Sequence, residues 1–137
     1  MFSHICLGIS DFGRAHAFYA PIMAALELKL RFSDPARGWA AWNTTTAGRP
    51  LFLIGKPFNG AAHEAGNGQM VAFMARTRAV VDQAYALALA NGGKDEGQPG
   101  VRPRYHANYY GAYFRDPDGN KVCVVCHEAE GGSARQP

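Results

Sequence analysis

The sequence has few cysteines, no long apolar run and no concentrated block of positive charge. Its three cysteines are an odd number, which argues against a disulfide framework. No apolar run approaches the roughly 20 residues that a membrane-spanning helix needs. Residues 1–5 lead directly into a strand-like pattern, without the basic region, apolar stretch and cleavage site of a signal peptide. We therefore expect a cytoplasmic protein with no membrane partner.

Positive charge is in slight excess but scattered. Fourteen Lys and Arg residues against eleven Asp and Glu residues leave a formal net charge of +3. The densest basic group is only Arg102, Arg104 and Arg115, without the basic stripe that is typical of nucleic-acid-binding surfaces. We therefore expect no nucleic-acid partner.

Cys123 and Cys126 have the spacing of a C-x-x-C motif, but their surroundings predict a strand. In a strand, an odd offset places two side chains on opposite faces. The sequence therefore predicts neither a redox pair nor a zinc pair here. With 137 residues, of which 47% are hydrophobic, the chain suits one compact domain or two small modules packed together.

The first half of the chain predicts a strand, a helix and three further strands. Apolar residues alternate in 3–10, and Asp11 stands where a helix N-cap belongs. Helical spacing of apolar residues predicts a helix from Phe12 to Glu27, with Pro21 inside it. The next three segments are strand-like: 28–33, 38–43 and 51–55.

The second half repeats this order after a connector rich in Gly and Ala. Residues 70–75 predict a strand, Thr77 is a candidate N-cap, and a helical stripe ends at 91–93. A Gly- and Pro-containing loop at 97–103 then leads to a predicted β-hairpin over 105–127. We expect one domain over 1–137, divided into these segments: modules of about 1–56 and 67–128, a connector at 57–66 and a frayed tail at 129–137.

Four segments carry a family resemblance: HICLGISD (4–11), RAHAFY (14–19), GNGQMVAF (66–73) and YYGAYFRDPDGN (109–120). In this order the chain resembles the vicinal oxygen chelate superfamily, which includes glyoxalases, bleomycin-resistance proteins and extradiol dioxygenases. The resemblance implies an α+β fold of two βαβββ modules, whose sheets form a curled mixed sheet around a cavity with the helices outside. On the first strands, it implies that two sets of side chains face the cavity: His4, Cys6 and Gly8, and Met70, Ala72 and Met74. Many related chains pair, so a homodimer is the expected macromolecular assembly.

Metal-dependent members of that superfamily hold a divalent ion with His, Gln or Glu side chains. Registering the two modules on their N-caps makes Met70 the counterpart of His4, and aligning Gly48 with Gly119 makes Phe52 the counterpart of Cys123. Of these four implied ligand positions, only His4 keeps the family pattern, because Phe52 cannot coordinate and the Met70 thioether is a soft ligand. Cys123 stands where a metal-binding relative usually has a carboxylate. A register shift of one residue would place Gln69 at the position of Met70.

The metal site therefore has His4 and Cys123 as its candidate ligands and is incomplete. A site without metal and a site holding zinc, iron, nickel or manganese remain the two alternatives. His4 is also interpreted as a neutral imidazole hydrogen-bonded across the cavity floor. Cys123 is interpreted either as a nucleophile with His4 as its base or as a small buried apolar residue.

Aromatic residues near the hairpin are the candidate substrate wall, because tyrosine offers a stacking face and a hydroxyl. We expect Tyr105, Tyr109 and Tyr110 to bind substrate, although alternating tyrosines are also ordinary strand residues. His106 and His4 are the candidate catalytic residues, since imidazole transfers protons near neutral pH. Arg102 is the candidate for holding an anionic substrate. Three further residues have expected places: His127 at the rim, and Trp39 and Trp42 on opposite faces.

Two classes of function follow. The first is a glyoxalase- or dioxygenase-like enzyme, a lyase or a dioxygenase, that acts on a small organic molecule in the sheet cavity beside a degenerate metal site. The second is a non-catalytic protein that binds and sequesters a planar compound, as bleomycin-resistance proteins do. Fold resemblance alone does not choose between them.

Overall fold

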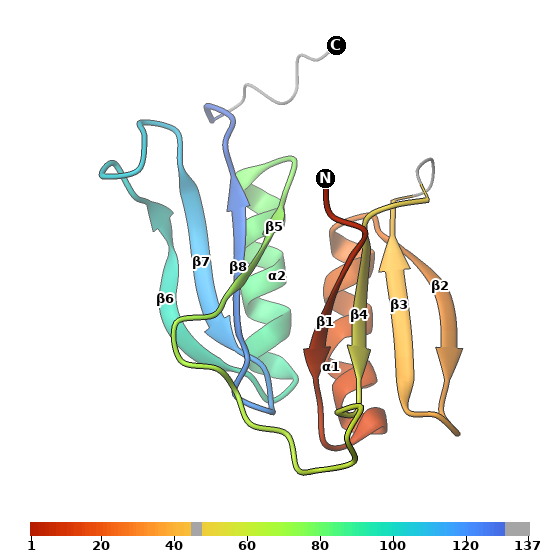
Figure 1. Cartoon of the computed structure of the whole chain (residues 1–137). Helices are drawn as coiled ribbons and strands as arrows, with labels where there is room; N and C mark the ends of the chain where they lie inside the picture. The colour runs from red at the N-terminus through yellow and green to blue at the C-terminus, as the bar shows by residue number, and fades with distance from the viewer. Residues whose placement is uncertain (45–47, 131–137) are drawn as a thin grey trace.

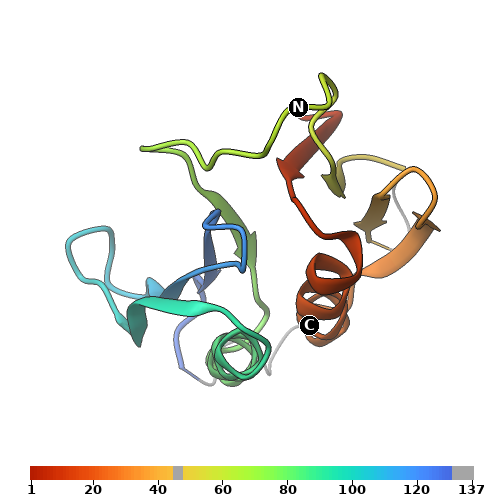
Figure 2. The ribbon, with the colours of Figure 1, turned by 90° about the horizontal axis from the view of Figure 1, so that it is seen from below.

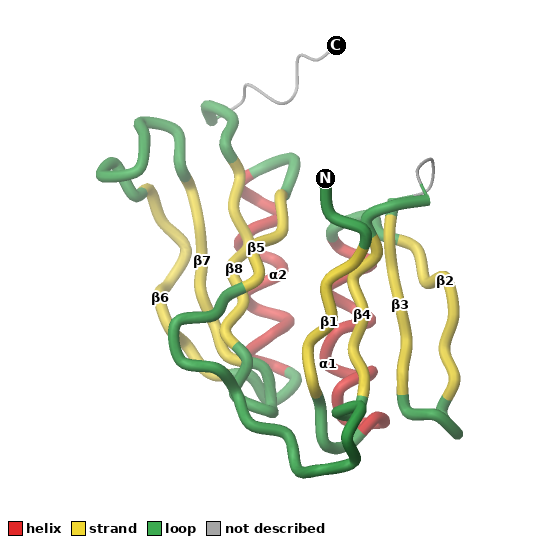
Figure 3. The backbone as a smooth tube through the Cα atoms, in the orientation of Figure 1, coloured by secondary structure: helices red, strands yellow, loops and turns green. Residues whose placement is uncertain are grey.

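The computed structural model describes residues 1–44 and 48–130, so the end of the predicted frayed tail, residues 131–137, lies outside the described part. Figures 1 and 3 show an α+β fold in which one order of elements occurs twice. The first module contains β1 (His4–Gly8), α1 (Phe12–Ala25), β2 (Lys29–Asp34), β3 (Trp39–Asn43) and β4 (Leu51–Gly55). The second contains β5 (Val71–Met74), α2 (Arg78–Ala90), β6 (Lys94–Val101), β7 (Tyr110–Arg115) and β8 (Lys121–Cys126). The prediction of two βαβββ modules is confirmed.

Each module forms its own mixed sheet, with strand orders β1-β4-β3-β2 and β5-β8-β7-β6. In each sheet the first strand pairs parallel with the last, and the other pairs are antiparallel. Figure 1 shows the sheets side by side, with edge strands β1 and β5 nearest each other and both helices behind. Figure 2 shows α1 and α2 next to one another on that side. Because the helices share one side, the sheets stay open and do not curl around a common cavity as expected.

Both helices begin at the predicted N-caps. The Asp11 carboxylate accepts a hydrogen bond from the backbone N–H of Arg14 at 2.9 Å, and the Thr77 hydroxyl accepts one from Val80 at 3.1 Å. α1 ends at Ala25, two residues before the predicted Glu27, because Glu27 has a left-handed φ of 62° that ends the helix. Neither helix in the described ranges is both long and apolar enough to cross a membrane.

The core lies between the helices and the sheets and is continuous between the modules. Ring contacts join Phe18 of α1 to Phe114 of β7, and Phe52 of β4 to Phe73 of β5. The helices contribute buried residues from both modules: Ala15, Phe18, Tyr19, Ile22, Met23, Val81, Ala84 and Ala88. Burial of these side chains stabilises the two modules as one packed unit.

The turn between β7 and β8 holds the second module to the first. Asp116 is buried and accepts a hydrogen bond from the Tyr19 hydroxyl at 2.6 Å. The side-chain amide of Asn120 donates to the backbone oxygen of Gly8 at 2.8 Å. Asp118 accepts from the Ser10 backbone N–H at 3.1 Å. These contacts orient the β7–β8 hairpin relative to α1 and β1.

Strand β6 corrects the sequence analysis, which predicted a loop at 97–103. β6 pairs antiparallel with β7, with register shifts between Asp95 and Gly97 and between Gly97 and Gly100. β6 is an edge strand, so Pro99 is tolerated although it lacks a backbone N–H. This strand was not predicted because its glycines, its proline and its two register shifts leave no alternation of apolar and polar residues.

Candidate functional site

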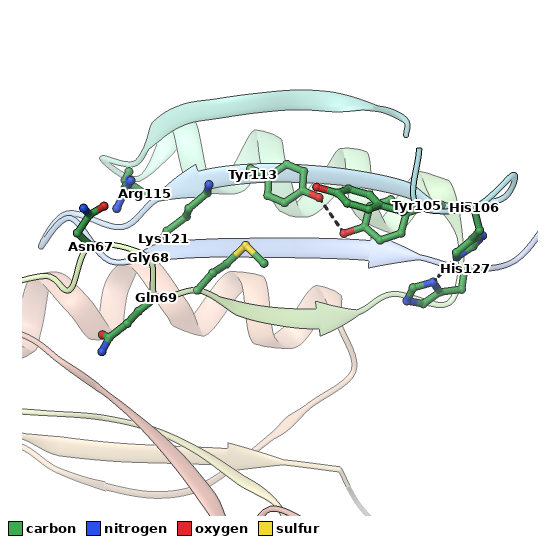
Figure 4. A pocket seen from close by; sticks show the side chains of 11 residues that line it. Asn67, Gly68, Gln69, Tyr105, His106, Tyr113, Arg115, Lys121 and His127 are labelled. Carbon is green, nitrogen blue, oxygen red and sulfur yellow. Dashed lines mark hydrogen bonds between the residues drawn. The ribbon is translucent and has the colours of Figure 1, made fainter. Parts of the chain in front are cut away.

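The main candidate site is a groove of about 610 Å³ on the open face of the second sheet, here called the second-sheet groove. Figure 4 shows Arg115 and Lys121 at one end, His106 and His127 at the other, and Tyr113 between them. One end is aromatic and is lined by Met70, Tyr105, His106, Tyr109, Tyr113 and His127. The other is polar and is lined by Asn67, Gly68, Gln69, Arg115 and Lys121.

The aromatic end depends on the loop between β6 and β7, which is folded against itself. Its ends are joined by the Arg102 backbone N–H, which donates to the Tyr109 carbonyl at 2.8 Å. Within the loop, the backbone N–H of Tyr105 donates to the Arg102 carbonyl, and the backbone N–H of Tyr109 donates to the His106 carbonyl. The rings of Tyr105 and Tyr109 lie 4.8 Å apart between centroids. The loop therefore presents two tyrosine rings in contact, tilted by 53° relative to each other, to the groove.

Two histidines form a hydrogen-bonded pair at this end. The His106 and His127 rings are stacked at 5.1 Å, with Nε2 of His106 lying 2.9 Å from Nδ1 of His127. The backbone N–H of Asn108 donates to Nδ1 of His106 at 3.1 Å, so this nitrogen carries no proton. Neutral His106 therefore donates from Nε2, and neutral His127 carries its own proton on Nε2. The two imidazoles thus form one hydrogen-bonded pair at the rim of the groove.

A chain of three polar groups lies in the floor of the groove. The hydroxyl oxygens of Tyr109 and Tyr113 are 2.8 Å apart, and the Tyr109 hydroxyl is 3.6 Å from Sγ of the fully buried Cys123. Burial raises the pKa of the Tyr109 phenol, and hydrogen bonds to Tyr113 and Cys123 raise it further. Burial also raises the pKa of Tyr113 and of the Cys123 thiol. All three groups are therefore neutral near pH 7.

The open face of the first sheet carries a separate pocket of about 800 Å³, here called the first-sheet pocket. His4, Cys6 and Trp39 line it, and the connector covers it with residues 56–64. The connector is close to the sheet, because a Cβ added to Gly8 would lie 2.4 Å from Nδ1 of His63. Trp42 packs in the core. The predicted opposite orientation of the two tryptophans is confirmed.

The predicted substrate wall lies in the second-sheet groove except for one tyrosine. Tyr105, His106 and Tyr109 line the groove. Tyr110 lies on the helix side of β7, where its hydroxyl donates to Asp82 of α2 at 2.7 Å, and this hydrogen bond raises the pKa of Tyr110 to about 12. Tyr110 therefore lies apart from the groove that Tyr105 and Tyr109 line, since adjacent residues of a strand face opposite ways.

Arg102 lies beside the groove, with its guanidinium carbon 5.5 Å from the centre of the Tyr113 ring. The structure does not bring His4 together with His106 or Cys123. His4 is exposed at the start of β1 and lines the first-sheet pocket, where its Nδ1 lies 2.8 Å from the Ser3 hydroxyl. Within one chain, His106 lines the second-sheet groove and His4 lines the first-sheet pocket, so the two histidines do not share a site.

The expected pairing of Phe52 with Cys123 is corrected by the strand faces. Phe52 packs in the core, and Leu53 is the residue of β4 that lines the first-sheet pocket. Cys123 lies on the face opposite the core residues of β8, beneath Tyr109. The alignment of the two modules was therefore wrong by one residue in the first module. The counterpart of Cys123 is Leu53, whose side chain is also apolar.

The residues at these positions do not fit a divalent metal ion. Leu53 cannot coordinate, Met70 offers a thioether, and Cys123 is a buried thiol whose raised pKa opposes the thiolate form that metals bind. Among the described residues, no three His, Cys, Asp or Glu side chains are grouped so that they would hold an ion. These side chains therefore do not form a binding site for a divalent metal ion.

Sequence analysis missed several residues that line the groove, among them Tyr113 and Lys121. Tyr113 is the β7 partner of Cys123, and Lys121 is the partner of Arg115. The turn at 116–120 carries the signal that identifies them, because its length determines which residues of β7 and β8 lie opposite each other. Counting outward from that turn places Tyr113 on the face of Cys123.

The class of fold is a pair of βαβββ modules, each of which forms an open sheet. Each sheet has a site on the face away from its helix. Comparison with family models matches residues 1–124 to the Glyoxalase/Bleomycin resistance protein/Dioxygenase superfamily. The chain belongs to this superfamily. A search of curated proteins finds no significant match.

Solved structures agree with this assignment. A glyoxalase/bleomycin resistance protein from Albidiferax ferrireducens T118 is 31% identical, with a TM-score of 0.78, and the match covers 92% of this chain and 98% of that one. A lactoylglutathione lyase from Agrobacterium tumefaciens is 24% identical, with a TM-score of 0.61 and 92% of each chain covered. A glyoxalase-related enzyme from Fulvimarina pelagi is 19% identical, with a TM-score of 0.69 and coverage of 92% and 87%. At these identities the last two show a likeness of fold alone.

Proposed function

We propose that the chain binds a small planar organic molecule in the second-sheet groove. The observation that carries the proposal is the aromatic wall, in which Tyr105, His106 and Tyr109 lie together along a groove of about 610 Å³. This volume is within the range of about 300–1,000 Å³ that is usual for small-molecule sites. Met70 lines the same groove and offers an adaptable apolar contact to a flat ligand.

The methionines of the chain supply a direct test. In protein labelled at the methionine methyl groups, ligands that enter the groove should shift the NMR signal of Met70 and leave that of Met23, which is buried in the core. A panel of aromatic acids, phenols and amides would be titrated. Replacing Tyr105 with Ala should weaken binding about 3- to 10-fold, the usual contribution of an aromatic contact.

Phe58→Ala is the matched control, because Phe58 is fully exposed and does not line the groove. Its ligand affinity should equal that of the unmodified protein. Equal weakening by both substitutions, or shifts confined to methionines other than Met70, would contradict the proposal.

A second candidate is catalysis of proton transfer at the same groove, in a lyase- or dioxygenase-like enzyme. It is favoured by the His106–His127 pair, whose hydrogen bonds leave the Nε2 proton of His127 without a described partner. Solvent deuterium exchange at the C3 methylene protons of phenylpyruvate, which are adjacent to its ketone, tests this directly when followed by NMR. We expect the protein to raise the exchange rate above that in buffer, and His127→Ala to abolish the increase. Exchange at the buffer rate would leave binding as the function.

We also propose that two copies of the chain pair. Apolar side chains are exposed away from the helices, with Met74 at 77% and Met70 at 44% exposure, and pairing would bury them. Size-exclusion chromatography with light scattering measures the mass directly. A mass of twice 14.8 kDa is expected, and the monomer mass at high micromolar concentration would contradict pairing.

A further inference from the structure

The floor of the groove holds a row of two tyrosine hydroxyls and one thiol. Together these groups have one donor proton more than the hydrogen bonds between them use. Cys123, Tyr109 and Tyr113 supply three donor protons, and the two contacts between them use two. If the thiol donates to Tyr109 and Tyr109 donates to Tyr113, the Tyr113 proton remains for a ligand. The reverse direction would leave a buried thiol proton without an acceptor. A ligand atom that accepts the Tyr113 proton favours the order in which Cys123 donates to Tyr109 and Tyr109 donates to Tyr113. In that order each hydrogen bond polarises the next one.

Two cations flank the Tyr113 ring. The ammonium nitrogen of Lys121 is 5.6 Å from the ring centre, and the guanidinium carbon of Arg102 is 5.5 Å from it. Neither cation forms an ion pair with a carboxylate within residues 1–44 and 48–130, whereas Arg115 of the same groove is paired with Glu96 at 3.1 Å. The Tyr113 ring therefore lies near two cations that no carboxylate of the described residues pairs with.

Strand β6 is shaped to admit Arg102. A Cβ added to Gly97 would lie 3.2 Å from one guanidinium nitrogen, and a Cβ added to Gly100 would lie 3.0 Å from the other. One of these nitrogens also donates to the Gln98 carbonyl at 2.7 Å. The guanidinium thus lies over backbone that carries no side chains, in a defined position beside Tyr113.

We infer that the groove takes its ligand as an anion, specifically a planar aromatic carboxylate, with the carboxylate accepting the Tyr113 hydroxyl proton and pairing with Lys121, while Arg102 adds positive charge from beside the groove. This inference rests on the proposed function and deepens it. The ring of the ligand lies toward Tyr105 and Tyr109, and the carboxylate lies toward the basic end. A carboxylate forms an ion pair with Lys121 and accepts a stronger hydrogen bond from the phenol than a neutral amide of the same shape does.

The test compares 2-naphthoate with 2-naphthamide, which have nearly the same shape and differ in charge. At pH 7.5 and low salt, calorimetry should show the acid binding at least 10-fold more tightly than the amide. Tyr113→Phe and Lys121→Gln should each reduce that ratio several-fold, because the hydrogen bond and the ion pair are stronger to a carboxylate than to an amide. Added salt should weaken the acid alone.

Tyr110→Phe is the matched control, since it removes a tyrosine hydroxyl from the other face of β7, and it should leave the ratio unchanged. Melting temperatures establish that each variant is folded. Equal affinity for acid and amide, both shifting the Met70 methyl signal, would overturn the anion inference and leave groove binding intact. An acid preference that survives both substitutions would overturn the assignment to these residues. No binding of either probe at millimolar concentration would overturn both proposals.

Discussion

Replacing Tyr19 with Phe should destabilise the whole chain, because one hydroxyl joins α1 to the hairpin that carries the second-sheet groove. Tyr19 is fully buried, and its hydroxyl donates to Asp116 Oδ2 at 2.6 Å. Burial raises the pKa of Tyr19, and the Asp116 carboxylate raises it further, so the hydroxyl is protonated and donates at every pH of interest. The substitution removes one oxygen atom and leaves the ring packing unchanged.

The magnitude follows from what remains around the carboxylate. Oδ2 of Asp116 keeps only the side-chain amide of Asn120 at 2.9 Å, and Oδ1 keeps the backbone N–H groups of Asp118 and Asn120. Loss of a buried hydrogen bond to a charged group costs about 2 kcal/mol. With about 0.3 kcal/mol/K of unfolding entropy for a chain of this length, the melting temperature should fall by about 7 °C.

Differential scanning calorimetry measures this change, and Tyr85→Phe is the matched control. The Tyr85 hydroxyl also donates to a carboxylate, that of Asp95, at 2.9 Å, but at the surface. Water replaces the lost partner there, so only a small shift is expected. Equal shifts for the two variants would refute the reasoning, because burial would then contribute nothing. Ligand affinity measured well below the melting temperature should be unchanged in Tyr19→Phe, since Tyr19 does not line the groove.

Four further predictions concern the thiols, the connector and metal content. A thiol reagent at pH 7.5 should label Cys6 before Cys123, because Cys6 is exposed and Cys123 is fully buried; mass spectrometry identifies the order, and early labelling of Cys123 would contradict its burial. Burial also raises the pKa of the Cys123 thiol. The same raised pKa favours the neutral thiol in the folded state, so the free energy of unfolding should decrease as pH rises above about 8.5, and Cys123→Ser should flatten this decrease. Gly8→Ala should cost about 1–3 kcal/mol by overpacking against His63, and His63→Ala in the same chain should recover most of it in urea titrations; an unaltered cost in the double variant would place the strain elsewhere. Elemental analysis of protein purified without chelators should find far less than one divalent ion per chain, and a stoichiometric ion that His4→Ala removes would show that the donor set was misjudged.

Most of the fold could be predicted because the signals were local. Asp11 and Thr77 act as caps through their own side chains, and apolar periodicity depends on the immediate segment. The hairpin prediction began too early, at Tyr105, whereas β7 begins at Tyr110. Aromatic residues are frequent both in strands and in binding loops, so composition alone could not separate the loop from the strand that follows it.

The site was less predictable because its members depend on which face each residue occupies. Tyr109 and Tyr110 are adjacent and identical, yet one lines the groove and the other contacts α2. Tyr109 lies at the end of the loop, where its carbonyl accepts a hydrogen bond from the backbone N–H of Arg102. This bond joins residues seven positions apart in a loop and has no local signature in the sequence.

The placement of the two sheets decides which candidate residues can act together. Alternation predicted correctly that His4 faces away from the core, but it holds no information on how one sheet lies relative to the other. Because α1 and α2 pack on one side, the open faces carry separate sites, and His4 belongs to a different site from His106.

Position 123 determines the electrostatic character of the second-sheet groove. A carboxylate here, as in metal-binding relatives, would place negative charge in the floor and offset Lys121 and Arg102. The thiol of Cys123 is neutral and lies beneath the Tyr109 hydroxyl, so the positive charge of the two cations is left uncompensated. A groove of this character attracts anions and repels divalent cations. The same residue that removes a metal ligand therefore favours a carboxylate ligand, and Cys123→Asp should reverse the preference of the groove for 2-naphthoate over 2-naphthamide.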